Sequence, residues 1–121
     1  MFSACQNWPV GEAAVLDREQ LKEITLNDEE LMREIVAALI DDTSRQIELL
    51  DAAIREEDSK RCVRLAHYSK GACANVGANA AAALLKHIER KAASQEFAEC
   101  TQSLGELSME MERLRSEVTS L

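Results

Sequence analysis

The chain has 121 residues, a formal net charge of −8, one proline and four glycines. This length is enough for a single domain with a real core, and the scarcity of proline and glycine favours long helices. The negative charge argues against nucleic-acid binding, which requires a basic surface.

Residues 1–15 show no clear hydrophobic period and contain the only proline, Pro9. We predict that they form a tail that packs loosely through Trp8, and that residues 16–121 form the folded domain. The first basic residue is Arg18, so the segment lacks the pattern of a secretory signal. No apolar run is long enough to span a membrane, and we expect a cytoplasmic protein.

Asp17 is a candidate N-cap for a short helix that ends near Ile24. Asn27 is predicted to cap the next helix, with Glu30 completing a capping box. The inward stripe of that helix is expected to be Leu31, Ile35, Ala38 and Leu39. The pattern breaks at residues 41–43 and resumes at Ile47, Leu50 and Ile54, which leaves open one bent helix or two in series.

Asp58 or Ser59 is predicted to cap a helix that ends at Val76, followed by Gly77 as a left-handed C-terminal residue. The next helix is expected from Asn79 to Ala93. Its inward residues are predicted to be Leu84, Leu85, Ile88 and Ala92.

The last helix has apolar residues spaced alternately by three and four positions, which is typical of a helix in a bundle. They are Phe97, Cys100, Leu104, Leu107, Met111, Leu114 and Val118. Because three other amphipathic helices can cover this seam, we expect it to pack within one molecule. The sequence therefore predicts an all-α, up-down four-helix bundle with a short extra N-terminal helix or helices, present as a monomer.

The four cysteines, Cys5, Cys62, Cys73 and Cys100, form no Cys-x-x-Cys pair, and three occupy apolar helix positions. We expect reduced, buried thiols and no metal site.

His67 lies on the polar side of its helix, opposite the small and apolar residues. Lys60, Arg64, Lys70 and Gly71 lie around it on the same side. A neutral imidazole is nucleophilic near pH 7 and can carry a phosphoryl group. Lys70, three residues on, can offset the phosphate charge, and Gly71 leaves space beside the ring for an incoming partner.

Residues 66–71 read Ala-His-Tyr-Ser-Lys-Gly, and residues 75–78 read Asn-Val-Gly-Ala. This pattern resembles the histidine-containing phosphotransfer (HPt) family of two-component phosphorelays. Ser69 departs from the pattern, because the family has an apolar residue there. A serine can bond back to the Leu65 carbonyl, so we expect only a small loss of stability.

The resemblance implies that His67 accepts a phosphoryl group from a receiver-domain aspartate or a histidine kinase and passes it to another receiver. It also implies that Glu89, 22 positions later, holds the imidazole ring. Mg²⁺ would belong to the receiver, and this chain would need no cofactor of its own. The chain has no phosphate-binding glycine loop and no acidic trio for magnesium, so we expect a carrier rather than an enzyme.

Five bases and no acids lie between Ser59 and His87, so the candidate site coincides with a basic zone in an acidic chain. Such a zone can attract an anionic partner. We predict that Lys60, Arg64, Tyr68 and Ala74 contact the partner.

Two alternatives remain open. The chain could be a helical adaptor that binds a receiver or kinase without carrying phosphate. It could also bind a metal or haem through His67 and His87, which would require both rings to point inward.

Overall fold

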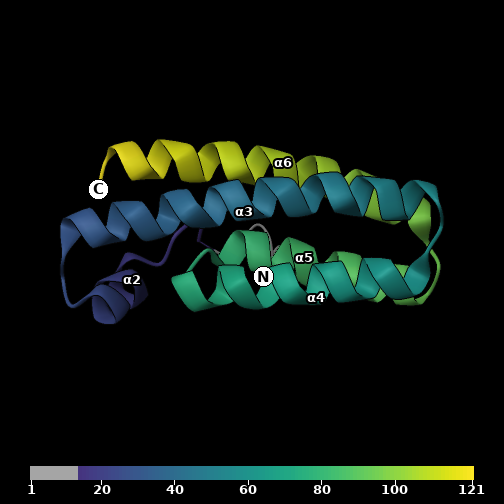
Figure 1. Ribbon diagram of the computed structural model, residues 1–121, viewed down its shortest axis with the longest axis horizontal. Helices are drawn as coiled ribbons and strands as arrows, with labels where there is room; N and C mark the ends of the chain where they lie inside the picture. The colour runs from purple at the N-terminus through teal and green to yellow at the C-terminus, as the bar shows by residue number, and fades with distance from the viewer. Residues whose placement is uncertain (1–13) are drawn as a thin grey trace, which may run out of the picture.

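The computed structural model describes residues 14–121, which form five helices and no strand (Figure 1). The helices are α2 (Arg18–Thr25), α3 (Glu29–Arg55), α4 (Ser59–Val76), α5 (Asn79–Ala93) and α6 (Phe97–Thr119). The predictions for Cys5 and Trp8 fall on residues outside this range.

Helices α3 to α6 form an up-down four-helix bundle. The packed pairs are α3 with α4, α4 with α5, α5 with α6, and α6 with α3. The short α2 lies across one end, against α3 and α4 (Figure 1). The predicted fold class is confirmed, and within residues 14–121 the short helix that precedes the bundle is α2.

Helix α2 is tied to the end of α6 by a polar contact. Arg18 donates to Glu117 Oε1 at 2.8 Å and to Ser120 Oγ at 2.8 Å. These bonds close the end of the bundle at which α2 lies.

Local sequence signals determine several helix ends. Asp17 Oδ1 accepts from Gln20 N at 3.2 Å, and Asp58 Oδ1 accepts from Arg61 N at 3.1 Å, so both aspartates are N-caps. Gly77 has φ of 96°, and a Cβ there would lie 2.9 Å from the Asp17 carbonyl oxygen. Glycine at this position therefore permits the left-handed turn and the close approach of the chain before α2.

The predicted cap of α3 is wrong. Asp28, not Asn27, accepts from Leu31 N, at 3.1 Å. Asn27 instead has φ of 65°, a left-handed conformation in the turn that follows α2. Asparagine tolerates this conformation well, so the residue supports the turn rather than the helix, and the capping box with Glu30 is not formed.

Helix α3 is one continuous helix across residues 41–43. Of its predicted inward stripe only Leu39 is fully buried, whereas Leu31 and Ala38 are exposed and Ile35 is half-buried. The buried residues of this segment are Met32, Val36, Leu39, Ile40 and Thr43. Both sets are apolar enough to satisfy a helical period, so the sequence did not determine the rotation of the helix.

The predicted inward residues of α5 are buried, and so are five of the seven residues of the α6 seam. Phe97 and Val118, at the ends of the seam, are partly buried against the same core. Cys62, Cys73 and Cys100 are buried free thiols, and burial raises the pKa of Cys73 and of Cys100 to about 11. These thiols are therefore inert at neutral pH.

Ser69 is buried, but its Oγ has no hydrogen-bond partner among the described residues. The predicted bond to the Leu65 carbonyl is not formed. Among residues 14–121, no helix is both long and apolar enough to span a bilayer.

Candidate functional site

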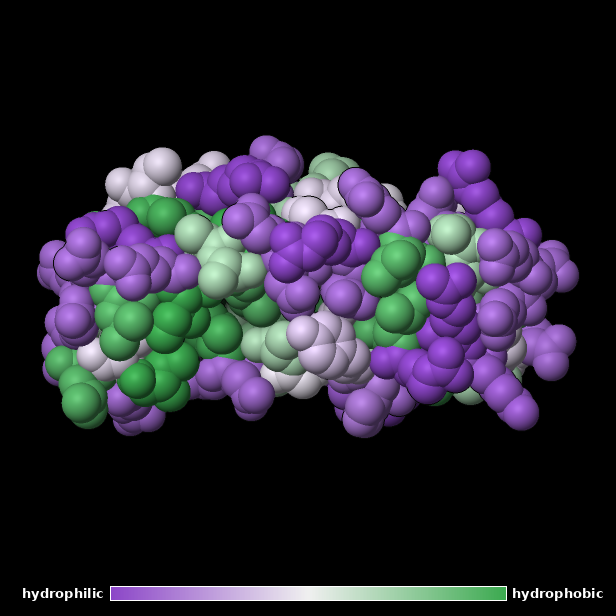
Figure 2. Space-filling view, viewed as in Figure 1, coloured by the Kyte–Doolittle hydropathy of each residue, from purple (hydrophilic) through white to green (hydrophobic). Residues whose placement is uncertain are grey.

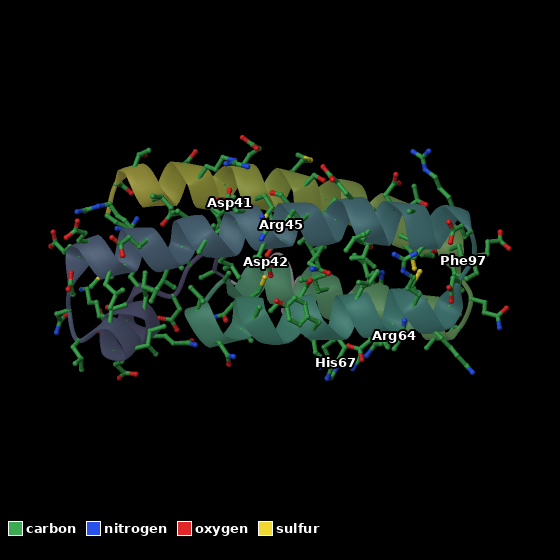
Figure 3. The ribbon with its side chains drawn as sticks, viewed as in Figure 1. Asp41, Asp42, Arg45, Arg64, His67 and Phe97 are labelled. Carbon is green, nitrogen blue, oxygen red and sulfur yellow. The ribbon has the colours of Figure 1, made fainter. Side chains whose placement is uncertain are left out.

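His67 projects from the outer edge of α4. Its side chain is 68% exposed, and it lies along the same edge as Arg64 (Figure 3). The opposite side of α4 buries Cys62, Ala66 and Cys73 in the core. The apolar periodicity of α4 therefore fixes the direction of the imidazole, because burying one side turns the other toward solvent.

A single carboxylate on α5 joins His67 to Lys70. Glu89 Oε2 lies 3.1 Å from His67 Nδ1, and Glu89 Oε1 accepts from Lys70 Nζ at 2.9 Å. Because a carboxylate can only accept, this contact holds the proton on Nδ1 and leaves Nε2 with a free lone pair.

The pKa of Glu89 is lowered from its ordinary value. Partial burial acts to raise it, but the hydrogen bonds from Lys70 and His67 act in the opposite direction and prevail. Glu89 is therefore an anion at neutral pH and remains an acceptor for both neighbours.

Gly71 lies one turn after His67, on the exposed side of α4. Among residues 14–121, no atom beyond the local helix backbone lies within 4 Å of the position that a Cβ would take here. Packing against these residues does not require glycine, so the open surface beside the imidazole is available for contact with another molecule.

Tyr68 takes part in a contact that the sequence analysis did not predict. Its hydroxyl donates to Asp42 Oδ2 on α3 at 3.1 Å, and Arg45 lies 3.6 Å from the other oxygen of Asp42. The Asp42 hydrogen bond, together with the charge of that carboxylate, raises the pKa of Tyr68. The Tyr68 ring, 55% exposed, is thus tethered on the α3 side of the imidazole.

Two other predicted contact residues, Lys60 and Ala74, lie farther from the imidazole. Lys60 and Ala74 are each seven residues from His67, about 10 Å along the helix axis. Both are exposed, and the Ala74 carbonyl accepts from Gln20 Nε2 of α2 at 2.7 Å. Of the predicted residues, the structure brings His67, Lys70 and Glu89 together and leaves Lys60, Arg64 and Ala74 along the same helix.

The metal or haem alternative needs His67 to point inward, and the exposure of its side chain contradicts that requirement. Within residues 14–121, no three His, Cys, Asp or Glu side chains gather as metal ligands would.

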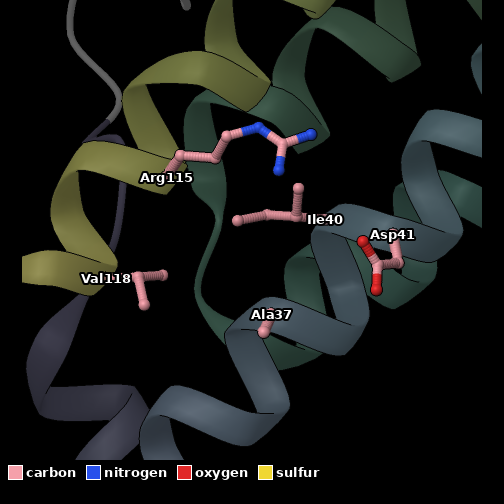
Figure 4. Close-up of a pocket in the computed structure, with 5 residues that line it drawn as sticks. All are labelled: Ala37, Ile40, Asp41, Arg115 and Val118. Carbon is pink, nitrogen blue, oxygen red and sulfur yellow. The ribbon is translucent and has the colours of Figure 1, made fainter.

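A recess of about 160 Å³ opens between α3 and α6 (Figure 4). It is lined by Ala37, Ile40, Asp41, Arg115 and Val118, none of which belongs to the candidate site.

The end of the molecule that carries α2 exposes several apolar side chains, visible as a green area on the left of Figure 2. Ile24, Leu26 and Leu31 are exposed there, and Leu26 is 87% exposed in a left-handed conformation. An exposed apolar cluster is typical of a protein contact surface. This cluster has no sequence signal of its own, because Leu26 lies in a turn outside any helical stripe.

Comparison with known proteins agrees with this geometry. The family model described as the Hpt domain matches residues 34–117. A solved structure, histidine-containing phosphotransfer protein B (HptB) from Pseudomonas aeruginosa PAO1, has the same fold, with a TM-score of 0.80 and 22% sequence identity. That similarity covers 90% of this chain and 95% of the other. No curated protein sequence matches the chain.

The family match covers more than half of the 121 residues and includes the histidine, the lysine, the glycine and the carboxylate of the candidate site. The chain belongs to the Hpt domain family, whose members carry phosphoryl groups in phosphorelays.

Proposed function

We propose that His67 accepts a phosphoryl group from the aspartyl phosphate of a receiver domain, or from a histidine kinase, and passes it to a second receiver. The observation that carries this proposal is the Glu89 carboxylate, which contacts both His67 Nδ1 and Lys70 Nζ. It leaves the exposed imidazole with one nitrogen held and the other available.

In the transfer, the Nε2 lone pair attacks phosphorus while the bond from phosphorus to the aspartyl oxygen breaks. The electron pair of that bond returns to the partner's carboxylate, so that an N–P bond replaces an O–P bond. The ring becomes cationic, and Glu89 stabilises it by accepting from Nδ1–H, as a carboxylate does beside a catalytic imidazole.

Lys70 places a cation beside the position that the phosphoryl oxygens would occupy. A charge-assisted bond to phosphate is stronger than one between neutral groups. Mg²⁺, where the reaction requires it, would be held by the receiver. On the return step the same geometry presents the phosphorus to a second aspartate, so this chain serves alternately as acceptor and donor.

Replacement of His67 tests the proposal directly. We expect His67→Gln to abolish acid-labile phosphorylation by phosphorylated receivers while the helical circular dichroism signal is unchanged, since the side chain is outside the core. His87→Gln is the matched control and should accept label as the wild type does.

Labelling of the His67→Gln variant at the wild-type rate would contradict the proposal. Receiver binding without any phosphorylation of the wild-type chain would favour the adaptor alternative.

A further inference from the structure

The cations of this chain fall into two groups according to their partners. Of the fourteen Lys and Arg residues, ten contact a carboxylate or a main-chain oxygen within the described part of the chain. The remaining four have no such partner there. They are Lys60, Arg64, Lys86 and Arg90.

These four residues, which we call the basic strip, are all exposed and lie on the two helices that form the candidate site. Lys60 and Arg64 precede His67 on α4 by seven and three residues, so they share its edge of the helix. Figure 3 shows Arg64 and His67 along that edge. Lys86 and Arg90 lie on either side of Glu89 in α5.

A shallow hollow lies at the α4 N-terminus, beside the last residue of α5. Its volume is about 500 Å³, and it is lined by Ser59, Lys60, Val63, Arg64 and Ala93. The Ser59 hydroxyl donates to the Ala92 carbonyl at 2.6 Å and fixes the two helix ends together. The hollow therefore combines a helix junction held by this hydrogen bond with two cations that contact no carboxylate or main-chain oxygen among residues 14–121.

The arrangement slightly disfavours folding. Lys60 with Arg64, and Lys86 with Arg90, are like charges four residues apart on a helix, and such pairs destabilise the helix slightly. The chain has 22 acidic residues, yet none of those described pairs with these cations. Intramolecular stability does not account for the strip, whereas attraction of an external anionic surface does.

We infer that the basic strip selects among receiver domains by charge, an inference that rests on the proposed function. The partner it fits is a receiver with acidic side chains on the surface around its phosphoacceptor aspartate. Those acids would meet Lys60 and Arg64 on α4, before His67, and Lys86 and Arg90 on α5, near Glu89. Charges at the rim of an interface chiefly change the association rate and its salt dependence.

The test compares phosphoryl transfer from a panel of phosphorylated receivers with labelling by phosphoramidate, a small donor that needs no protein interface. Lys60→Glu/Arg64→Glu and Lys86→Glu/Arg90→Glu should each lower the transfer rate from acidic-faced receivers by about tenfold or more at low salt. The difference should shrink at high salt, because salt screens the interaction. Labelling by phosphoramidate should stay within about twofold of the wild type.

Arg33→Glu/Arg115→Glu is the matched control, because it changes the net charge equally on the exposed α3 and α6 surfaces. Wild-type transfer rates in both strip variants, or an equal loss in the control, would overturn the inference.

Failure of the proposed function looks different: the wild-type chain would then take label from neither phosphoramidate nor any receiver. In that event, the role of the basic strip is tested by the Kd of the chain for unphosphorylated receivers. If the charge-reversal variants have the same Kd as the wild type, the strip does not select receivers.

Discussion

Glu89 is the residue on which the geometry around the imidazole depends, because it is the acceptor for both His67 and Lys70. Its side chain is 23% exposed, so solvent screens these contacts only in part. Its pKa is lowered despite a contribution from burial that raises it. A carboxyl group whose pKa is lower in the folded than in the unfolded protein stabilises the fold when ionised.

We therefore expect Glu89→Gln to lower the free energy of unfolding by about 1 kcal/mol at neutral pH. This deficit should be complete above the ordinary pKa of 4.5 and disappear as the pH falls through the lower folded-state value. Thermal unfolding of both proteins across pH 3–7 measures the difference. A deficit that persists undiminished at the acid end would show that the carboxylate charge is not its cause.

The second prediction at the residue scale concerns the effect of Gly71 on receiver binding. None of the described residues occupies the space beside it, so Gly71→Gln should weaken receiver binding by steric block without unfolding the helix. The fold offers a matched control in Gly105 of α6, which is also exposed with open space around it. A binding titration in which Gly71→Gln and Gly105→Gln behave alike would remove Gly71 from the interface.

Individual residues differ in how far the sequence could predict their contacts. Glu89 was assigned through the family resemblance, and the structure places it against the imidazole; its role in transfer remains a prediction. The bond between Tyr68 and Asp42 joins residues 26 positions apart on different helices. No local pattern encodes such a pair, and it depends on the rotation of α3, which the sequence left undetermined.

At the scale of the helices, the predicted helix limits are correct where the local sequence signals agree and wrong where two signals compete. Helix α5 has the predicted limits, because Gly77 ends the preceding helix unambiguously and one apolar stripe dominates. The start of α3 has two adjacent candidates, Asn27 and Asp28, either of which can cap a helix. Asn27 adopts the left-handed conformation of the turn, and Asp28 is therefore the N-cap of α3.

This correction predicts an asymmetry between neighbouring substitutions. Asp28→Ala should lower the free energy of unfolding by about 1 kcal/mol, because it leaves Leu31 N without its acceptor. Asn27→Gly should be neutral or stabilising, because glycine adopts the left-handed conformation without strain. Denaturant unfolding of both variants measures the two effects. If Asn27→Gly lowered the free energy of unfolding and Asp28→Ala did not, Asn27 would be the N-cap.

At the scale of the whole molecule, the bundle separates two surfaces with different properties. The α4–α5 side carries the imidazole and the four cations that contact no carboxylate or main-chain oxygen in the described part of the chain. Elsewhere, Arg18, Arg55 and Arg115 each pair with a carboxylate of the same chain. The remaining chain is strongly acidic, which keeps like molecules apart. The same distribution that attracts an acidic-faced partner to one side thus opposes self-association through the others.

The apolar seam of α6 leads to a prediction about the oligomeric state of the protein. Leu107 and Leu114 are fully buried and Met111 nearly so, against the other helices of the same chain. Because folding already covers the seam, we expect the thermal midpoint to be independent of protein concentration and the sedimenting species to be a monomer. Unfolding coupled to dissociation would instead raise the midpoint with concentration.

Leu107→Ala provides the internal check. Removing this buried side chain should cost about 2–5 kcal/mol through lost burial and a residual cavity, and it should leave the sedimenting mass unchanged. If the seam instead held two chains together, the same substitution would shift the mass toward the monomer as it lowered stability. Lower stability with an unchanged sedimenting mass is therefore expected only if the α6 seam packs within one chain.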